Sequence, residues 1–264
     1  MELLKQLREM TGAGMVDCKK ALDESNGDLN AAVEFLRKKG IAKSAKRADR
    51  ETSEGVVAVA VNDDYTEGYA IEVNSETDFV ARSDKFQEFV TKSLELVKTK
   101  KPANVEELLA LEMDGSTVGD TLNTMSGVIG EKLAVKNISI LNGATVAAYS
   151  HFGGRIGVLV AIDAAGKKEE AIDIAMQIAA ANPKYLVPAE VDPTEMEKEK
   201  NIYREQLVKE GKPAEMVEKI LEGKMSKYYS EVCLMEQEFI KDDKKKVKDV
   251  LGGANISAFI RFSL

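Results

Sequence analysis

One pattern occurs twice in the middle of this sequence, and it constrains the fold more than any other feature. Residues 56–61 and 69–73 have the β-branched composition of two strands around a turn, and a helix with a buried apolar stripe follows at 83–98. The same order of strand, turn, strand and helix returns roughly ninety residues later, with its strands at 144–150 and 156–162. The repetition predicts an α+β fold in which two related subdomains share a core.

The first forty residues predict a compact domain of three short helices. Apolar residues repeat at helical spacing until Gly12 interrupts the first helix, and Asp28 is a good N-cap for the third. Gly40 is expected to end that helix. Residues 41–54 contain few apolar side chains and many lysines and arginines, so we expect a linker there.

A different pattern covers residues 193–230. Charged residues of both signs are interspersed, apolar positions are sparse but periodic, and Gly211 and Pro213 interrupt the helical pattern. A narrow apolar stripe of this kind predicts an antiparallel coiled-coil hairpin that projects into solvent. Residues 103–137 are expected to be helical, and the chain is expected to end in a strand at 256–262.

These expectations divide the 264 residues into modules, as is usual for a chain too long for one compact core. The expected parts are a three-helix domain at 1–40, a linker at 41–54, core subdomain N at 55–142, core subdomain C at 143–192 and 231–264, and the hairpin at 193–230.

Composition excludes several classes of function. The net charge of −8, from 37 basic and 45 acidic side chains, argues against direct binding of nucleic acid. Two cysteines and one histidine are too few for a disulfide framework or a His/Cys metal cluster. No apolar stretch approaches the ~20 residues of a membrane span, and no signal peptide is visible. We therefore expect a cytoplasmic protein with no metal, cofactor or membrane partner.

Catalytic signatures are also missing from the sequence. No segment has the GxxxxGK[ST] spacing of a phosphate-binding loop, and no GxSxG nucleophile elbow is present. A hydrolase would have to be built around His151, the single histidine, which lies beside a tight turn. A turn or surface histidine is the better interpretation, and we expect no catalytic residues.

One connection carries residues that a plain turn does not need. Residues 74–82 lie between a strand and a helix, yet they place the acidic Asp78 directly before the aromatic Phe79. One interpretation is an ordinary helix start, with Thr77 or Ser83 as the cap and the ring packed on the helix. The other is a presented wedge, in which an apolar ring enters a pocket of a partner beside a carboxylate.

Five motifs resemble those of the elongation factor Ts family, and they occur in that family's order. They are TGAGMVDCKKAL at 11–22, ETDFVAR at 76–82, RIGVLV at 155–160, GKP at 211–213 and FIRF at 259–262. The resemblance extends over essentially the whole chain. One such motif could arise by chance, but five in order indicate membership of the family.

The resemblance implies a fold, a partner and a set of contact residues. The fold would comprise an N-terminal three-helix domain of the ubiquitin-associated (UBA) type, two α+β core subdomains and a helical hairpin. Members of the family are not enzymes; they bind elongation factor Tu, GDP-bound and nucleotide-free, and accelerate GDP release.

Three groups of contact residues are carried over from the family. The residues that would disturb the magnesium site of the partner are Thr77, Asp78, Phe79 and Val80. Those that would pack on a helix of its GTPase domain are Arg8, Met15, Val16 and Ile240. Those that would contact another domain, from the second core subdomain, are His151, Gly153, Gly154 and Arg155.

The main alternative is an interaction adaptor without exchange activity. An adaptor would have the same composition and the same lack of catalytic motifs. It would have no need for an acidic residue followed by an aromatic one between a strand and a helix, so residues 77–80 distinguish the two hypotheses.

Overall fold

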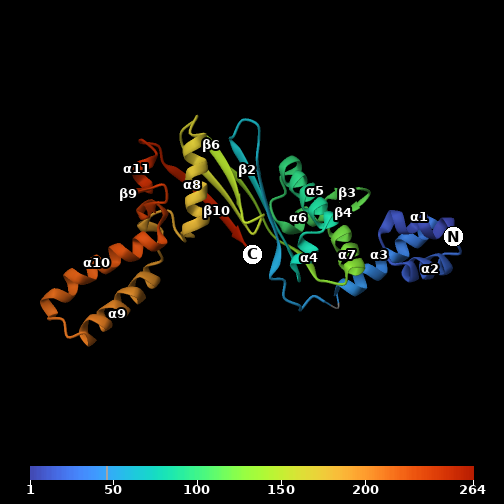
Figure 1. Cartoon of the computed structure of the whole chain (residues 1–264), viewed down its shortest axis with the longest axis horizontal. Helices are drawn as coiled ribbons and strands as arrows, with labels where there is room; N and C mark the ends of the chain where they lie inside the picture. The colour runs from blue at the N-terminus through green and yellow to red at the C-terminus, as the bar shows by residue number, and fades with distance from the viewer. Residues whose placement is uncertain (46) are drawn as a thin grey trace.

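The computed structural model describes residues 1–45 and 47–264, and it shows a mixed α+β molecule, as expected. The N-terminal helices lie at one end of the long axis (Figure 1). Two three-stranded sheets occupy the middle, and helices α9 (Pro193–Lys209) and α10 (Ala214–Val232) lie at the other end.

Three helices form the N-terminal module: α1 (Glu2–Thr11), α2 (Met15–Glu24) and α3 (Leu29–Ala45). Its small core contains the buried side chains of Leu7, Cys18 and Ala32. The first helix ends at Gly12, which has the left-handed φ of 66° that glycine adopts readily. The third helix differs from expectation, because it continues past Gly40 to Ala45. Residues 41–45 of the expected linker are therefore helical.

Gly40 has a packing role instead of a terminating one. It lies where α3 crosses α7 (Val118–Ile129), and a Cβ atom on Gly127 of α7 would come within 2.7 Å of the Gly40 Cα atom. Two glycines at one crossing let the two backbones approach closely. An ion pair between Arg37 and Asp120 adds to the same contact.

The first sheet has the strand order β1-β2-β5, with both pairings antiparallel. The elements of this unit are β1 (Glu54–Val61), β2 (Glu67–Ser75), α4 (Asp78–Ala81), α5 (Asp84–Lys100), α6 (Val105–Ala110), β3 (Glu112–Met113), β4 (Ser116–Thr117), α7 and β5 (Leu133–Asn142). Its core joins Ile71 and Val73 of β2 to Phe86 and Phe89 of α5.

The strand β5 corrects the expectation that residues 103–137 are helical. Helix ends at Ile129, and the strand begins at Leu133 and pairs with the whole of β2. Val135 and Ile138 lie opposite Val73 and Ile71, so β-branched residues face one another across the strands. Tertiary pairing with a buried strand thus decides the conformation of this segment.

The second sheet has the equivalent strand order, β10-β7-β6, again antiparallel throughout. Its strands are β6 (Thr145–His151), β7 (Ile156–Ile162) and β10 (Ile256–Ser263), and the following helix is α8 (Lys168–Ala181). Val158 and Val160 pack with Ile174 and Ile178 of α8 in one fully buried cluster. The strands expected at 144–150, 156–162 and 256–262 are all confirmed.

The two sheets pack against each other in the middle of the molecule (Figure 1). Gly157 of β7 lies directly against the side chain of Val57 in β1, where a Cβ atom would have no room. The backbone N–H of Val57 also donates a hydrogen bond to the carbonyl of Gly154 at 2.7 Å. The turn between β6 and β7 is therefore fixed to the first sheet.

The remaining elements are the 3-10 helices η1 (Pro188–Glu190) and η2 (Leu234–Glu236), α9 (Pro193–Lys209), α10 (Ala214–Val232), β8 (Glu238–Phe239), β9 (Asp242–Lys246) and α11 (Val247–Val250). Helices α9 and α10 extend away from the sheets as an arm (Figure 1). At its base, the carboxylate of Glu195 accepts hydrogen bonds from the hydroxyls of Tyr185 at 2.7 Å and Tyr228 at 2.8 Å. None of the described helices is both long enough and apolar enough to span a membrane.

Candidate functional site

The connection between β2 and α5 presents an aromatic ring to solvent. Phe79 is 84% exposed, whereas Ala81, two residues later, is buried in the first core. Phe79 and Ala81 lie on opposite sides of the single helical turn α4, which places one in solvent and the other in the core. Thr77 caps this turn and accepts a hydrogen bond from the Val80 N–H at 3.4 Å. A ring exposed to this extent is not packed onto the helix, so the interpretation of residues 74–82 as an ordinary helix start does not describe Phe79.

Side chains distant in sequence fix the base of this connection. Both carboxylate oxygens of Glu131 accept hydrogen bonds from Thr77, one from its N–H at 3.0 Å and one from its hydroxyl at 2.7 Å. The neighbouring Glu76 accepts from the Lys132 N–H at 2.6 Å and pairs with Arg50 at 3.1 Å. These two donors, the Lys132 N–H first, lower the pKa of Glu76. The sequence did not identify Glu131, which is 54 residues from Thr77.

Asp78 lies beside the exposed ring and is partly accessible. Its carboxylate pairs with Arg82 one helical turn later, at 3.1 Å. Both side chains are substantially exposed, so the pair is worth only about 0.3–0.5 kcal/mol and a stronger interaction can displace it. The carboxylate is therefore available to an incoming group.

A second aromatic tip lies at the turn between β6 and β7. Phe152 is 72% exposed and has a φ of 51°, and Gly153 and Gly154 continue the turn with left-handed φ values. The ring of His151 lies 4.1 Å from that of Phe152, and its Nδ1 is 3.0 Å from the Tyr149 hydroxyl. This is the environment of a turn histidine.

The predicted residues of the second core subdomain all lie at this turn. Arg155 follows Gly154 and forms an ion pair with Glu54 of the first sheet. Phe152 also lies in this turn, but it is not one of the contact residues that the family resemblance implies. Its position between His151 and two glycines was the only signal available, since an exposed phenylalanine in a tight turn has no packing role.

The β2–α5 connection and the β6–β7 turn border one groove of about 350 Å³. Asp78, Ala81 and Arg82 line it from the first unit, and Phe152, Gly153 and Arg155 from the second. A partner that covers the wedge would therefore meet the β6–β7 turn as well.

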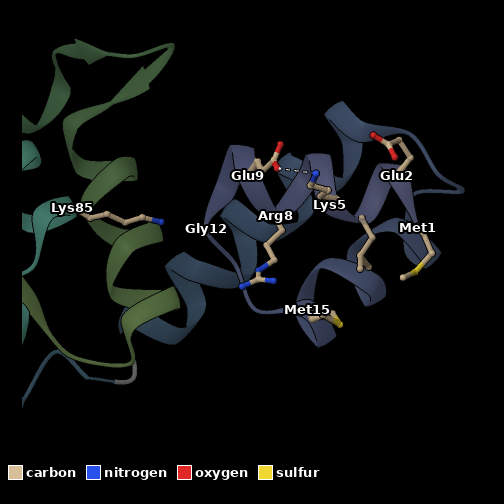
Figure 2. Close-up of a pocket in the computed structure, with 9 residues that line it drawn as sticks. Met1, Glu2, Lys5, Arg8, Glu9, Gly12, Met15 and Lys85 are labelled. Carbon is tan, nitrogen blue, oxygen red and sulfur yellow. Dashed lines mark ion pairs between the residues drawn. The ribbon is translucent and has the colours of Figure 1, made fainter.

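The N-terminal module has a separate hollow of about 670 Å³. Arg8 and Met15 line it, as do Met1 and Leu4, and Lys85 approaches from α5 (Figure 2). Met15 is 58% exposed and its neighbour Val16 is 82% exposed. Three of the residues predicted to contact a partner helix are thus accessible on one small module.

The fourth member of that group lies elsewhere. Ile240 is 49% exposed in the hairpin between β8 and β9, where its N–H donates to the Gln177 side chain at 2.8 Å. This hairpin and the N-terminal module lie on opposite sides of the two sheets along the long axis (Figure 1). The structure does not bring Ile240 together with Arg8, Met15 and Val16.

Exposed apolar side chains lie at several separate places on the described surface, among them Phe79, Phe152 and Met15. Among the residues described, no group of three or more His, Cys, Asp or Glu side chains is placed to hold a metal ion. Exposed aromatic side chains held at ordered turns are typical of a protein that contacts another macromolecule.

Comparison with known proteins identifies the family. Residues 76–264 match the family model for elongation factor TS. The elongation factor Ts of a Nitratiruptor species is 45% identical, over 99% of this chain and 91% of the relative. That of Prosthecochloris aestuarii is 44% identical, over 99% of this chain and 96% of the relative. The chain belongs to the elongation factor Ts family.

Proposed function

We propose that this chain is a guanine nucleotide exchange factor that binds GDP-bound elongation factor Tu and promotes GDP release during translation elongation. Membership of the family supports the partner and the process. The observation that carries the mechanism is the 84% exposure of Phe79 next to an accessible carboxylate. An apolar ring held in water has no role in the core of this chain, and it is suited to fill a pocket of a partner.

The proposed mechanism acts on the magnesium ion of the partner. This ion links protein and diphosphate in a GTPase, so loss of its coordination removes much of what holds GDP. Phe79 would enter the GTPase domain, and Asp78 would disturb the magnesium site electrostatically, with Thr77 and Val80 shaping the tip. The factor lowers the affinity of its partner for GDP by the same amount by which GDP lowers the affinity of the partner for the factor. The factor must therefore bind the nucleotide-free state of its partner more tightly than the GDP-bound state. A coupling of ~4 kcal/mol would change nucleotide affinity about a thousandfold.

Other contacts would hold the two proteins together while the wedge acts. Arg8, Met15 and Val16 would pack on a helix of the GTPase domain from their separate module. The turn at His151, Gly153, Gly154 and Arg155 would contact another domain, and it borders the same groove as Asp78. Ile240 would contribute from the far hairpin, as a separate contact.

We also infer the finer organisation from this arrangement. The three N-terminal helices would be a UBA-like domain, and α9 and α10 a coiled-coil arm. The equal strand order of the two sheets supports two repeated core subdomains, at 55–142 and at 143–192 with 231–264. The chain would perform no chemical reaction of its own, would bind neither nucleic acid nor membrane, and would act in the cytoplasm with the translation machinery.

The decisive experiment follows the release of a fluorescent GDP analogue from elongation factor Tu. We expect this chain to accelerate release strongly at substoichiometric concentration, because an exchange factor turns over. An adaptor without exchange activity would bind the partner and leave the release rate unchanged. That outcome would refute the proposal.

A further inference from the structure

We infer that Glu131 is a positioning residue for the wedge, and that its carboxylate sets the direction in which α4 presents Asp78 and Phe79. The inference rests on the proposed function and adds a residue to it. Glu131 lies outside the connection between β2 and α5, and it reaches that connection only through its side chain.

Helix α4 needs an external restraint. It spans only Asp78–Ala81, a single turn, and a helix of that length has little stability of its own. Its cap is also long, at 3.4 Å between the Thr77 hydroxyl oxygen and the Val80 nitrogen. Something beyond the local sequence must keep this turn in one orientation if the exposed ring is to enter a pocket reproducibly.

Glu131 supplies that restraint at two points. Its oxygens accept the N–H and the hydroxyl of Thr77, so the carboxylate fixes both the backbone and the side chain of the capping residue. The hydroxyl hydrogen is committed to Glu131, which leaves the Thr77 oxygen to accept the Val80 N–H. The charge makes both bonds to Glu131 stronger than neutral ones.

The position of Glu131 is itself fixed by a long helix. It follows Gly130, the left-handed residue that ends α7, and its carbonyl accepts a hydrogen bond from the Ser126 hydroxyl at 2.5 Å. The guanidinium of Arg47, just beyond the N-terminal module, donates to the Ser126 carbonyl at 3.0 Å. The wedge is thus oriented by the end of α7, the helix that also packs on α3.

The test compares Glu131→Ala with Glu112→Ala, a matched change at an exposed glutamate of the same unit. We expect Glu131→Ala to lower the maximal rate of GDP release about tenfold, because small misplacements at a working site have large effects on rate. Affinity for the nucleotide-free partner should change less than about threefold, since it is spread over several contacts. Glu131→Gln should be intermediate, because it keeps one acceptor oxygen but faces the Thr77 N–H with an amide. Glu112→Ala should match wild type.

Two further measurements separate positioning from simple destabilisation. Amide hydrogen exchange at residues 77–80 should speed up in Glu131→Ala while the melting temperature stays within a few degrees of wild type. The losses from Thr77→Val and Glu131→Ala should be less than additive in the double variant, because the two changes share the hydrogen bond between the Thr77 hydroxyl and Glu131.

Three results would overturn the inference. They are wild-type rates in Glu131→Ala, additive losses in the double variant, and a loss of activity that merely follows a fall in melting temperature. If wild type itself fails to accelerate GDP release, the proposed function fails first. Faster hydrogen exchange at residues 77–80 in Glu131→Ala would still report the restraint on α4.

Discussion

Two connections in this molecule join a central strand to the helix that covers it, and they differ in what they carry. In the first unit, residues 76–83 lead from β2 to α5 and include α4 with the exposed ring of Phe79. In the second unit, residues 163–167 lead from β7 to α8 as a short turn with no large apolar side chain. The sheets on either side have equivalent strand order, so the structural task is the same.

The difference shows which residues the fold requires. A short turn is sufficient to reverse the chain between strand and helix, as the second unit demonstrates. The second connection uses its one carboxylate for the fold, since Asp163 accepts hydrogen bonds from the N–H and the amide group of Asn255, at 2.7 and 2.9 Å. The first connection has a similar pair of hydrogen bonds, between Thr77 and the carboxylate of Glu131. These bonds fix the start of α4, which exposes the ring of Phe79 to solvent. Residues beyond the needs of the fold are the ones available for a partner.

The largest effect should come from removing the ring that distinguishes the first connection. Phe79→Ala should lower exchange activity at least about thirtyfold, since a ring buried against a partner contributes about 2–3 kcal/mol. Stability should change by less than about 0.5 kcal/mol, because the ring is exposed in the free protein. GDP release and thermal melting measure the two quantities.

Phe86→Ala is the matched control for that variant. Phe86 lies seven positions later in α5 and is fully buried. The same truncation there should cost about 3–5 kcal/mol of stability. If Phe79→Ala melts as low as Phe86→Ala, the ring belongs to the core and the two connections do not differ as described.

Removing the charge beside the ring should have a smaller effect. Asp78→Asn keeps the size of the side chain, so packing on the partner should survive and affinity for the nucleotide-free state should change little. GDP release should slow about tenfold if the carboxylate acts on the magnesium site. Because Asp78 pairs with Arg82, Arg82→Gln is the control for loss of that ion pair alone.

Stripping magnesium with EDTA tests how Asp78 acts. The difference between Asp78→Asn and wild type should narrow in EDTA, since the group on which the charge acts is gone. A difference that persists undiminished would mean that the carboxylate does not act through the metal. Phe79 would then be the only exchange device in the first connection.

How far these features could be predicted from sequence depends on the range of the interactions involved. Residues 156–162 were predicted as a strand and form one, because the alternation of β-branched residues is a local pattern that indicates a strand. Strand β5 was missed, since it is selected by pairing with β2, whose residues lie about sixty or more positions earlier in the chain. Gly40 does not end its helix, contrary to the prediction, because it serves the crossing with Gly127, a tertiary contact that the local sequence does not reveal.

The candidate site shows the same limit. Motifs identified Asp78 and Phe79, but only the structure decides between a ring packed on its helix and a ring in solvent. Glu131 was missed because nothing near position 131 indicates a link to Thr77. A motif of neighbouring residues such as Asp78 and Phe79 can be recognised in the sequence. The distant residues that orient such a motif, here Glu131, are known only once the fold is known.

Truncating Phe152, the second aromatic tip, should have a smaller effect than the changes in the first connection and a larger effect than a change in the second connection. Phe152 lies in the groove that the wedge borders, but it belongs to the turn at the start of β7. Phe152→Ala should weaken affinity for nucleotide-free elongation factor Tu about threefold to tenfold and leave the maximal rate of GDP release unchanged. Titration of the rate against factor concentration separates the two parameters. A reduced maximal rate at saturation would place Phe152 in the exchange device.

The smallest effect is expected in the second connection, where it should concern stability alone. Hydrogen bonds from the Asn255 backbone N–H, and then from its side chain, lower the pKa of Asp163. A carboxyl group whose pKa is lower in the folded state stabilises the fold above its unfolded pKa, and this contribution is lost as pH falls through the folded pKa. Asp163→Asn should therefore melt at a slightly lower temperature than wild type at pH 7, and the difference in melting temperature should shrink below about pH 4.

Other carboxylates titrate in the same range, so the melting temperatures of the two proteins must be compared at each pH. GDP release at pH 7 should be the same for both. A pH-independent difference in melting temperature would show that the charge of Asp163 is not what matters, and slower GDP release would show that the second connection also serves the partner.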